Sequence, residues 1–242
     1  MECPVCGAKI NPGDKLCRHC GNDELPNVQT LSAQKDLSEN GMSGEDIFSD
    51  SIRGVLEIES HTQNAVSLGS GFLVSGNGYA LTNAHVVTES GKKNTNIKAK
   101  LCGESIEAEL VELGDNNSGY GNGIDLALLK LKRVPASARC LKFGDSGNVK
   151  NGETVYVIGN SKGEGTCITR GIVSDKLRKV GGRNLIMTDC AVNPGNSGGP
   201  MFNNQNEVIG VVVSGYVNAE GMNFAIPSNS VKEFLAACSV KV

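Results

Sequence analysis

The stretch DCAVNPGNSGGPMF, residues 189–202, places Ser197 inside a run of glycine, asparagine and proline. These are the residues of tight turns, so the segment is expected to be a loop. Two interpretations are open. The loop is either a plain surface turn or a loop that directs the Ser197 hydroxyl and nearby backbone N–H groups at one spot. The rest of the sequence has to decide between them.

Short apolar runs separated by glycine, asparagine and aspartate make up most of the chain around this loop. The step from Asn77 to Gly78 between two such runs is a hairpin signal. One helix is expected near the end, in NSVKEFLAAC, with Ser228 as its N-cap after Pro227. The pattern predicts an all-β fold, a sandwich or a barrel. Strands are expected at residues 71–75, 79–83, 125–131, 154–159, 167–177, 184–189 and 207–216.

The overall composition is that of an ordinary globular protein, with 39% apolar and 20% charged residues. A net charge of −3 gives no strong attraction to nucleic acid or to anionic membranes. Apolar runs such as residues 208–213 are far too short to span a bilayer. Residues 1–21 contain no apolar core of a signal peptide. We therefore expect a cytoplasmic protein with no membrane partner.

Four of the nine cysteines form two matched pairs, Cys3 with Cys6 and Cys17 with Cys20. Each Cys-x-x-Cys turn aims two thiolates at one metal, and four thiolates complete the closed tetrahedral shell of structural zinc. The segment is too short for a core of its own, so one zinc ion would fold it, with roughly 10–16 kcal/mol of binding free energy in comparable peptides. The alternatives are a pair of disulfides, or iron in place of zinc. The segment resembles a zinc ribbon.

These patterns divide the chain into three parts. Residues 1–22 are the zinc ribbon, residues 23–45 are a polar flexible linker, and residues 46–242 are the main domain. The other five cysteines are scattered and odd in number, which favours a reducing compartment. Nucleic-acid binding by the ribbon is not favoured, because acidic residues offset its basic ones and it has no aromatic side chain to stack on bases.

A serine nucleophile needs a base to take its proton, a group to orient that base, and donors for the oxyanion. The chain has three histidines. His19 belongs to the cysteine segment and His61 lies in a polar stretch expected to be a loop, which leaves His85 as the candidate base. Asp125 opens an apolar run, where a carboxylate is costly unless it is paired. A structural histidine and a turn aspartate are the alternatives, and Asp189 is a competing acid that we interpret as structural.

Chain order connects these residues to a fold. His85, Asp125 and Ser197 follow the order of the chymotrypsin-like double β-barrel, which agrees with the predicted strands. Five segments then closely resemble the protease domain of the HtrA/Deg family, in order from about residue 50 to 236. They are GSGFLVSGNGYALTNAHVV, GIDLALLKL, TRGIVS, TDCAVNPGNSGGPMF and GMNFAIPS.

This resemblance implies a serine endopeptidase and gives each residue a role. His85 would be the general base, Asp125 its orienting acid and Ser197 the nucleophile. The backbone N–H groups of Gly195 and Ser197 would form the oxyanion hole. Members of the family also hold this loop in an inactive conformation.

The resemblance also implies a specificity pocket. In chymotrypsin-like enzymes its base lies six residues before the nucleophile, which here is the neutral Ala191. The opposite wall would come from residues 213–216, beginning at Val213, and Phe224 would help to close the pocket. A small apolar pocket implies cleavage after Val, Ala, Ile or a similar residue, rather than after Lys or Arg. The expected substrates are unfolded or damaged polypeptides.

The accessory parts depart from the family. No room remains after the last expected helix for the C-terminal PDZ domain that members commonly carry, and the zinc ribbon takes its place as an accessory part. Residues 43–53 are a candidate for the N-terminal segment through which members often trimerise, so a homotrimer is one candidate assembly. The alternative to an active protease is an adaptor or sensor. Its ribbon would bind a protein partner, and its protease-like domain would bind peptides in a latent state.

Overall fold

The computed structural model describes residues 8–9, 18–20, 41–61, 65–89, 92–94, 96–114, 123–213 and 221–241. The chain divides into two compact units, residues 1–41 and residues 42–242. In the first unit, the predicted zinc ligands Cys3, Cys6 and Cys17 lie outside the described residues, and Cys20 is exposed. Most of the predicted linker also lies outside them. The zinc ribbon and the linker therefore stay predictions.

The second unit begins with a short helix. The helix α2 (Gly44–Ser51) is capped by Ser43, whose hydroxyl accepts the N–H of Asp46 while the Asp46 carboxylate accepts the N–H of Ser43. Ile47 on its inner face is fully buried. A short 3-10 helix, η1 (Ile52–Gly54), follows directly. The domain start predicted at residue 46 falls inside α2, because a helix with so few buried side chains reads as a polar linker in sequence.

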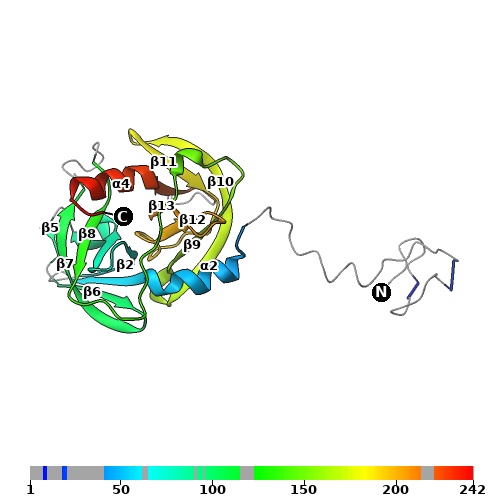
Figure 1. Cartoon of the computed structure of the whole chain (residues 1–242). Helices are drawn as coiled ribbons and strands as arrows, with labels where there is room; N and C mark the ends of the chain where they lie inside the picture. The colour runs from blue at the N-terminus through cyan, green and yellow to red at the C-terminus, as the bar shows by residue number, and fades with distance from the viewer. Residues whose placement is uncertain are drawn as a thin grey trace. The chain divides into compact units, whose positions relative to one another are not determined.

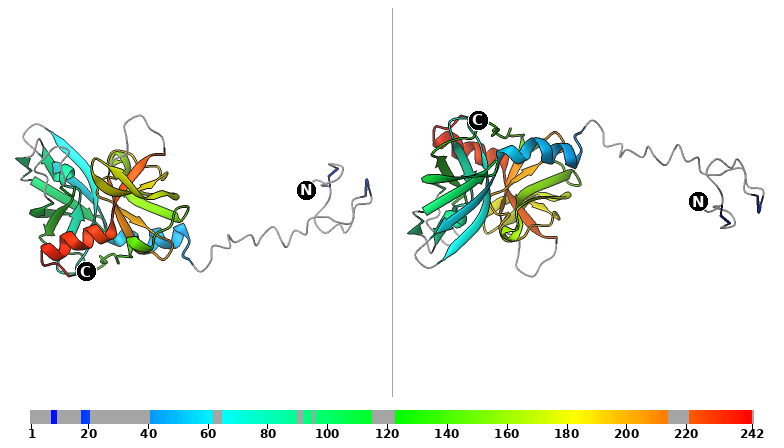
Figure 2. Two further views of the ribbon diagram at one scale, coloured as in Figure 1. Left: turned by 90° about the horizontal axis from the view of Figure 1, so that it is seen from above. Right: turned by 90° about the horizontal axis from the view of Figure 1, so that it is seen from below.

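Two closed antiparallel barrels make up most of this unit (Figure 1). Figure 2 shows them side by side, with the C-terminal helix lying across them. The first barrel consists of β1 (Val55–His61), β2 (Val66–Leu73), β3 (Tyr79–Thr82), β8 (Ala127–Leu131), β7 (Glu104–Leu113) and β6 (Asn96–Leu101). The second consists of β10 (Thr166–Val180), β11 (Arg183–Thr188), β14 (Asn223–Pro227), β13 (Val208–Val213), β12 (Pro200–Phe202) and β9 (Thr154–Asn160). A small ribbon pairs β4 (Thr88–Glu89) with β5 (Lys92–Lys93).

Alternating side chains fill the barrels. In β6, Ile97, Ala99 and Leu101 are buried between exposed neighbours, which is the alternation that directs every second residue of a strand into a barrel. The ring of Phe72 in the first barrel packs edge-on against Phe143, with ring centroids 5.8 Å apart. Because Phe143 belongs to the segment that joins the two barrels, this contact anchors the connection. Each such large apolar side chain contributes about 1.5–3 kcal/mol when buried.

The last element is the helix α4 (Ser228–Ala237). It was expected to start after Ser228, but Ser228 is its first helical residue and Pro227 occupies the N-cap. The buried Ser228 hydroxyl instead donates to the carbonyl oxygen of Gly144 over 3.0 Å. It also accepts the N–H of Ser146, in the 3-10 helix η2 (Ser146–Asn148), over 3.1 Å. The serine therefore fastens the helix to the segment between the barrels.

The structure confirms the predicted all-β double barrel with a C-terminal helix. The hairpin expected at Asn77 and Gly78 joins β2 to β3, and Gly78 has a φ of +94°, a conformation that favours glycine. The loop predicted around His61 is wrong at that residue, because His61 is the last residue of β1. Its ring contacts the Glu59 carboxylate on the same strand, so a polar strand end was mistaken for a loop.

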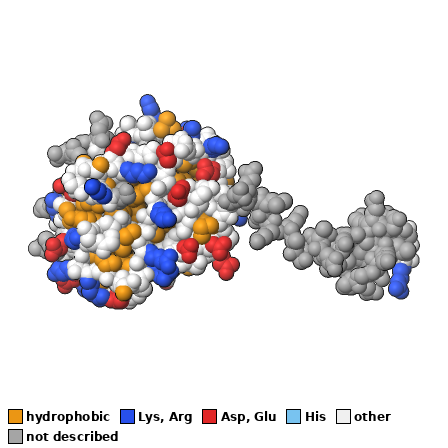
Figure 3. Space-filling model, in the orientation of Figure 1, with side chains coloured by type: hydrophobic (Ala, Val, Ile, Leu, Met, Phe, Trp, Pro, Cys, Tyr) orange, Lys and Arg blue, Asp and Glu red, His pale blue; other side chains and the backbone are white. Residues whose placement is uncertain are grey.

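The surface mixes charges of both signs. Figure 3 shows basic and acidic side chains interspersed on one face of the barrel unit, with apolar side chains between them. This distribution agrees with the small net charge of −3. Within the described part of the chain, no helix combines the length and the apolar character needed to cross a bilayer.

Candidate active site

The predicted base lies on a single helical turn of the first barrel. His85 belongs to α3 (Ala84–Val87), which follows β3 after Asn83. Its neighbours Ala84, Val86 and Val87 are buried and fix the turn against the barrel. The His85 side chain remains about half exposed, at 47%. The ring is therefore held by a packed backbone and still reaches the surface.

The predicted acid faces this ring. One carboxylate oxygen of Asp125, Oδ2, lies 2.6 Å from His85 Nδ1, and the other, Oδ1, accepts the backbone N–H of His85 over 3.0 Å. The side-chain amide of Asn83 donates to the Asp125 carbonyl oxygen over 2.8 Å. An ionised carboxylate only accepts hydrogen bonds, so the proton of a neutral His85 belongs on Nδ1. This leaves Nε2 with a lone pair that can take a proton.

The charge on Asp125 is stabilised by its neighbours. Burial by itself raises the pKa of this carboxyl, but the hydrogen bonds and charge of His85 outweigh burial and lower its pKa below the usual value. The positive charge of Arg183 acts in the same direction. The Asp125 side chain is 18% exposed. The carboxyl is therefore ionised at neutral pH.

The predicted nucleophile lies in a tight loop of the second barrel. Gly195 and Gly198 have φ angles of +100° and +85°, which require residues without a Cβ. The N–H of Gly198 donates to the carbonyl oxygen of Val212 over 2.8 Å, which fixes the loop to β13. Ser197 itself is only 7% exposed.

The loop lies against the segment that leads to His85. A Cβ added at Gly198 would clash with the Thr82 hydroxyl and come within 2.9 Å of the Asn83 nitrogen. Ser197 is thus brought beside the chain two residues before His85. Among the described residues, no hydrogen bond joins Ser197 Oγ to the His85 ring. Catalytic hydrogen bonds are often long or poorly aligned before substrate binds, so His85 stays the candidate base for Ser197.

Two backbone donors in the loop are not used by the described residues. The N–H groups of Gly195 and Ser197 donate to none of them. Each belongs to a peptide plane that is fixed from its carbonyl side: Pro194 O accepts the N–H of Lys162 over 2.7 Å, and Asn196 O accepts that of Gly199 over 3.0 Å. In a trans peptide the N–H and C=O point in opposite directions. These hydrogen bonds therefore contribute to the directions of the two unused N–H groups.

Known proteins resemble this chain. The trypsin-like peptidase domain family matches residues 69–211, more than half of the chain. The chain belongs to this family. It is also similar to curated and solved proteases of the HtrA/DegP type.

Curated relatives of this trypsin-like peptidase domain are longer proteins. A probable periplasmic serine endoprotease, DegP-like, from Rickettsia conorii is 35% identical over 88% of this chain and 41% of the relative. A protein of the same name from Pseudomonas putida is 40% identical over 68% of this chain and 33% of the relative. The chain therefore spans less than half the length of these relatives.

Solved structures agree with this assignment. The HtrA-type protease AlgW with a tripeptide is 30% identical, with a TM-score of 0.71 over 81% of this chain and 63% of that chain. A serine endoprotease from Yersinia pestis is 28% identical, with a TM-score of 0.67 over 81% of this chain and 66% of that chain.

The comparison contradicts the cytoplasmic location expected from the sequence. The well-matched curated relatives are named periplasmic. The expectation rested on an N-terminal segment without an apolar core and on scattered cysteines. The N-terminal segment lies outside the barrels, whereas the scattered cysteines lie within the barrel unit, with Cys167 in β10 and Cys190 buried. Neither feature records the compartment.

The residues predicted to line the specificity pocket of this peptidase domain come from three segments. Val213 at the end of β13 pairs with Phe224 on β14, and Phe224 is 3% exposed. The side-chain amide of Asn223 donates to the carbonyl oxygen of Cys190 over 2.7 Å, which places β14 beside the residue before Ala191. Ala191 is exposed. The rest of the predicted wall, residues 214–216, lies outside the described residues.

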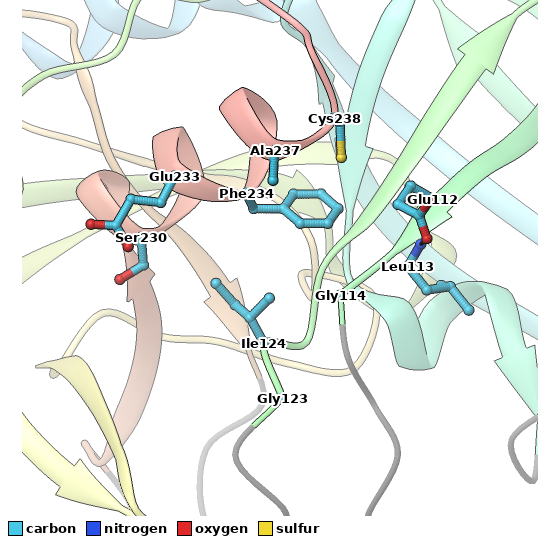
Figure 4. A pocket seen from close by; sticks show the side chains of 10 residues that line it. All are labelled: Glu112, Leu113, Gly114, Gly123, Ile124, Ser230, Glu233, Phe234, Ala237 and Cys238. Carbon is cyan, nitrogen blue, oxygen red and sulfur yellow. Dashed lines mark hydrogen bonds between the residues drawn. The ribbon is translucent and has the colours of Figure 1, made fainter.

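The competing acid is occupied elsewhere. Asp189 accepts the N–H of Ile172 over 2.6 Å, so its carboxylate closes the junction between β10 and β11. A cavity of about 620 Å³ lies under α4, between Phe234 and Ile124, and its lining contains none of the predicted catalytic residues (Figure 4). Among the described residues, no cluster of His, Cys, Asp and Glu is suited to hold a metal ion.

The sequence interpretation missed three residues that support the loop. The Ser70 hydroxyl donates to the carbonyl oxygen of Gly195 and accepts the N–H of Asn160. The N–H of Lys162 donates to the carbonyl oxygen of Pro194. Ser70 carried a weak signal, since it is a small polar residue at the start of a buried apolar run. Asn160 and Lys162 act through their backbone N–H groups, which residue types do not indicate.

Proposed function

We propose that this chain is a serine endopeptidase that uses His85, Asp125 and Ser197 as a catalytic triad. The observation that carries the proposal is the double hydrogen bond between Asp125 and His85. It fixes the ring in the orientation and tautomer that a general base needs. The glycine-containing loop around Ser197 supplies the second half of the site.

The reaction follows from these roles. Ser197 Oγ attacks the carbonyl carbon of a peptide bond while His85 Nε2 accepts the hydroxyl proton. The N–H groups of Gly195 and Ser197 hold the oxyanion. His85 then gives the proton to the leaving amine, and water hydrolyses the acyl ester with the same base. Asp125 keeps the ring oriented and stabilises the imidazolium that forms in each step.

The substrate class follows from the pocket residues. Ala191, Val213 and Phe224 carry no charge, so the pocket favours a small apolar residue such as Val, Ala or Ile before the cleaved bond. Unfolded or damaged polypeptides expose such residues. The test is turnover of two matched peptides that differ only in Val or Lys at this position. Faster cleavage of the Val peptide, abolished by Ser197→Ala, is expected, and preference for the Lys peptide would contradict the pocket.

A latent peptide-binding protein is the second candidate function. The lack of a hydrogen bond between Ser197 Oγ and His85 favours it. In that case the chain would bind peptides without turning them over. Binding of the Val peptide, measured by fluorescence anisotropy, together with no Ser197-dependent cleavage would favour this candidate over an active protease.

The N-terminal segment is proposed to hold one structural zinc ion. Cys3, Cys6, Cys17 and Cys20 together offer four thiolates, the donor set of closed zinc sites. Zinc there would stabilise the fold of residues 1–22 and take no part in hydrolysis. One zinc per chain, lost when Cys3 and Cys6 are both changed to serine, is the expected elemental analysis. A full-length chain purified without zinc would contradict this assignment.

The assembly is proposed to be a homotrimer through residues 43–53. This segment forms α2 and η1, and Ile47 is buried within the same chain, so contacts to other copies would use the outer face. Light scattering of the full chain tests this, and a monomer at micromolar concentration would contradict it.

A further inference from the structure

A buried serine of the first barrel reaches into the loop that carries Ser197. Ser70 lies in β2 and is fully buried. We propose that Ser70 is a positioning residue that holds the Gly195 and Ser197 N–H groups in the orientation of an oxyanion hole. The inference rests on the proposed function and adds to it a residue that belongs to neither the triad nor the loop.

The Ser70 hydroxyl has one possible hydrogen-bond direction. It accepts the backbone N–H of Asn160 over 2.8 Å, and it lies 2.7 Å from the carbonyl oxygen of Gly195. A backbone N–H only donates and a carbonyl oxygen only accepts. The single hydroxyl proton must therefore point at Gly195. This hydrogen bond is made inside the protein, where electrostatic interactions are less screened than in water.

The backbone of Ser70 makes a second hydrogen bond to the same loop. Its N–H donates to the carbonyl oxygen of Ser197 over 2.8 Å. Its own carbonyl oxygen accepts the Thr82 hydroxyl over 2.7 Å, which fixes Ser70 to β3. Ser70 thus donates hydrogen bonds to the carbonyl oxygens of both Gly195 and Ser197, the residues on either side of Asn196.

These two carbonyls alternate with the two N–H groups that the mechanism needs. The peptide plane that joins Asn196 to Ser197 carries the Ser197 N–H. Along the chain it lies between the carbonyl groups of Gly195 and Ser197, both of which are hydrogen-bonded to Ser70. The peptide plane that joins Pro194 to Gly195 carries the Gly195 N–H, and it is next to the peptide plane that carries the Gly195 carbonyl. Gly195 has no Cβ to restrict rotation about its backbone bonds. Without the Ser70 hydroxyl, the carbonyl of Gly195 loses its partner, and rotation at this glycine turns the neighbouring N–H away.

The surroundings limit this position to a small side chain. A Cβ added at Gly159 would lie 2.8 Å from Ser70 Oγ, and one added at Gly199 would lie 3.3 Å from Ser70 Cβ. Glycine at both positions lets the hydroxyl sit between the barrels. Ser70→Ala removes the hydroxyl, and with it the hydrogen bonds to Gly195 and Asn160, but keeps the two hydrogen bonds made by the Ser70 backbone.

The test compares two buried serines of the same barrel. Ser60 is also fully buried, and its hydroxyl accepts a hydrogen bond from the Asn94 side-chain amide over 2.6 Å, but among the described residues no hydrogen bond joins it to the loop. We expect Ser70→Ala to lower kcat for the Val peptide about 10- to 100-fold with KM unchanged, since a full oxyanion donor is worth about 10²–10³-fold. Binding of a peptide aldehyde, which mimics the tetrahedral state, should weaken by the same factor. Ser60→Ala should keep kcat within about twofold of wild type.

Each outcome decides a separate point. A Ser70→Ala variant with wild-type kcat, or one that loses no more than Ser60→Ala, would overturn the role of Ser70. If Ser70→Ala does not fold, as judged by circular dichroism, Ser70→Cys replaces it. Its weaker S–H donor should also lower kcat at unchanged KM, and an undiminished kcat would overturn the role. A wild-type chain without Ser197-dependent turnover would contradict the proposed function itself, and the role of Ser70 with it.

Discussion

Ser70 donates its backbone N–H to the carbonyl oxygen of Ser197 over 2.8 Å, from a strand of the first barrel to a loop of the second. The candidate site is assembled across the same junction. His85 and Asp125 come from the first barrel, and Ser197 comes from the second. Each barrel therefore holds an incomplete site, and the hydrogen bonds between barrels set the geometry of the whole.

Asp125→Asn tests the orientation of the base. An asparagine amide keeps the size of the side chain but can donate to the ring, which favours the wrong tautomer of His85. We expect kcat to fall by about 10⁴-fold with little change in folding. Steady-state peptide cleavage measures this. Asp145→Asn is the matched control, because Asp145 hydrogen-bonds Gly147 and Asn229 away from the triad and should keep full activity.

The lowered pKa of Asp125 predicts a pH dependence of stability. A carboxyl whose pKa is lower in the folded state stabilises the fold above its unfolded pKa, near 3.8. This stability is lost as pH falls through the lower, folded pKa. Wild type should therefore lose more unfolding free energy than Asp125→Asn between about pH 5 and pH 2. Urea denaturation at each pH measures the unfolding free energy of both proteins. The same pH dependence of this free energy in wild type and Asp125→Asn would contradict the lowered pKa of Asp125.

Gly195→Ala tests the shape of the loop. The new Cβ would clash with the carbonyl oxygen of Asn160, and the φ of +100° is strained for alanine. Gly152→Ala is a matched control, since Gly152 has a φ of +85° and nothing within 4 Å of its Cβ position. We expect Gly152→Ala to lose about 1 kcal/mol of stability from backbone strain, and Gly195→Ala to lose more because of its clash with Asn160. Only Gly195→Ala should lose most of its kcat, and equal activities would contradict the loop assignment.

Ser228→Ala tests the docking of the last helix. The buried hydroxyl bridges Gly144 and Ser146, so its removal leaves the Ser146 N–H without a partner, while the Gly144 carbonyl oxygen keeps its hydrogen bond from Lys232 Nζ. We expect a loss of about 1–3 kcal/mol in unfolding free energy with unchanged kcat. Chemical denaturation measures the first and peptide cleavage the second. A stability equal to wild type would show that water replaces the hydroxyl.

The all-β fold and the pairing of His85 with Asp125 could be predicted from the sequence. The apolar run at residues 125–131 predicted the strand β8 (Ala127–Leu131), whereas β6 was not among the predicted strands although it alternates buried Ile97, Ala99 and Leu101 with exposed residues. His85 and Asp125 could be paired because histidine is rare in the chain and a carboxylate at the start of an apolar run needs a partner. Chain order then indicated the fold.

Other parts of the site depend on backbone geometry that residue types do not encode. Lys162 contributes only its N–H, from a left-handed conformation with a φ of +56°. Ser70 resembles any small residue in a buried strand until its partners on the second barrel are known. The helix α2 was missed because it is only eight residues long and its two apolar residues, Ile47 and Phe48, are adjacent and give no helical period. The compartment could not be read from the barrels at all.

The central claim is that Ser197 is an activated nucleophile, and a fluorophosphonate probe tests it most directly. The full-length chain and Ser197→Ala would be treated in parallel and measured by intact mass spectrometry. We predict one adduct on wild type and none on Ser197→Ala. A folded wild-type chain that gains no adduct, or an adduct that persists on Ser197→Ala, would contradict the account.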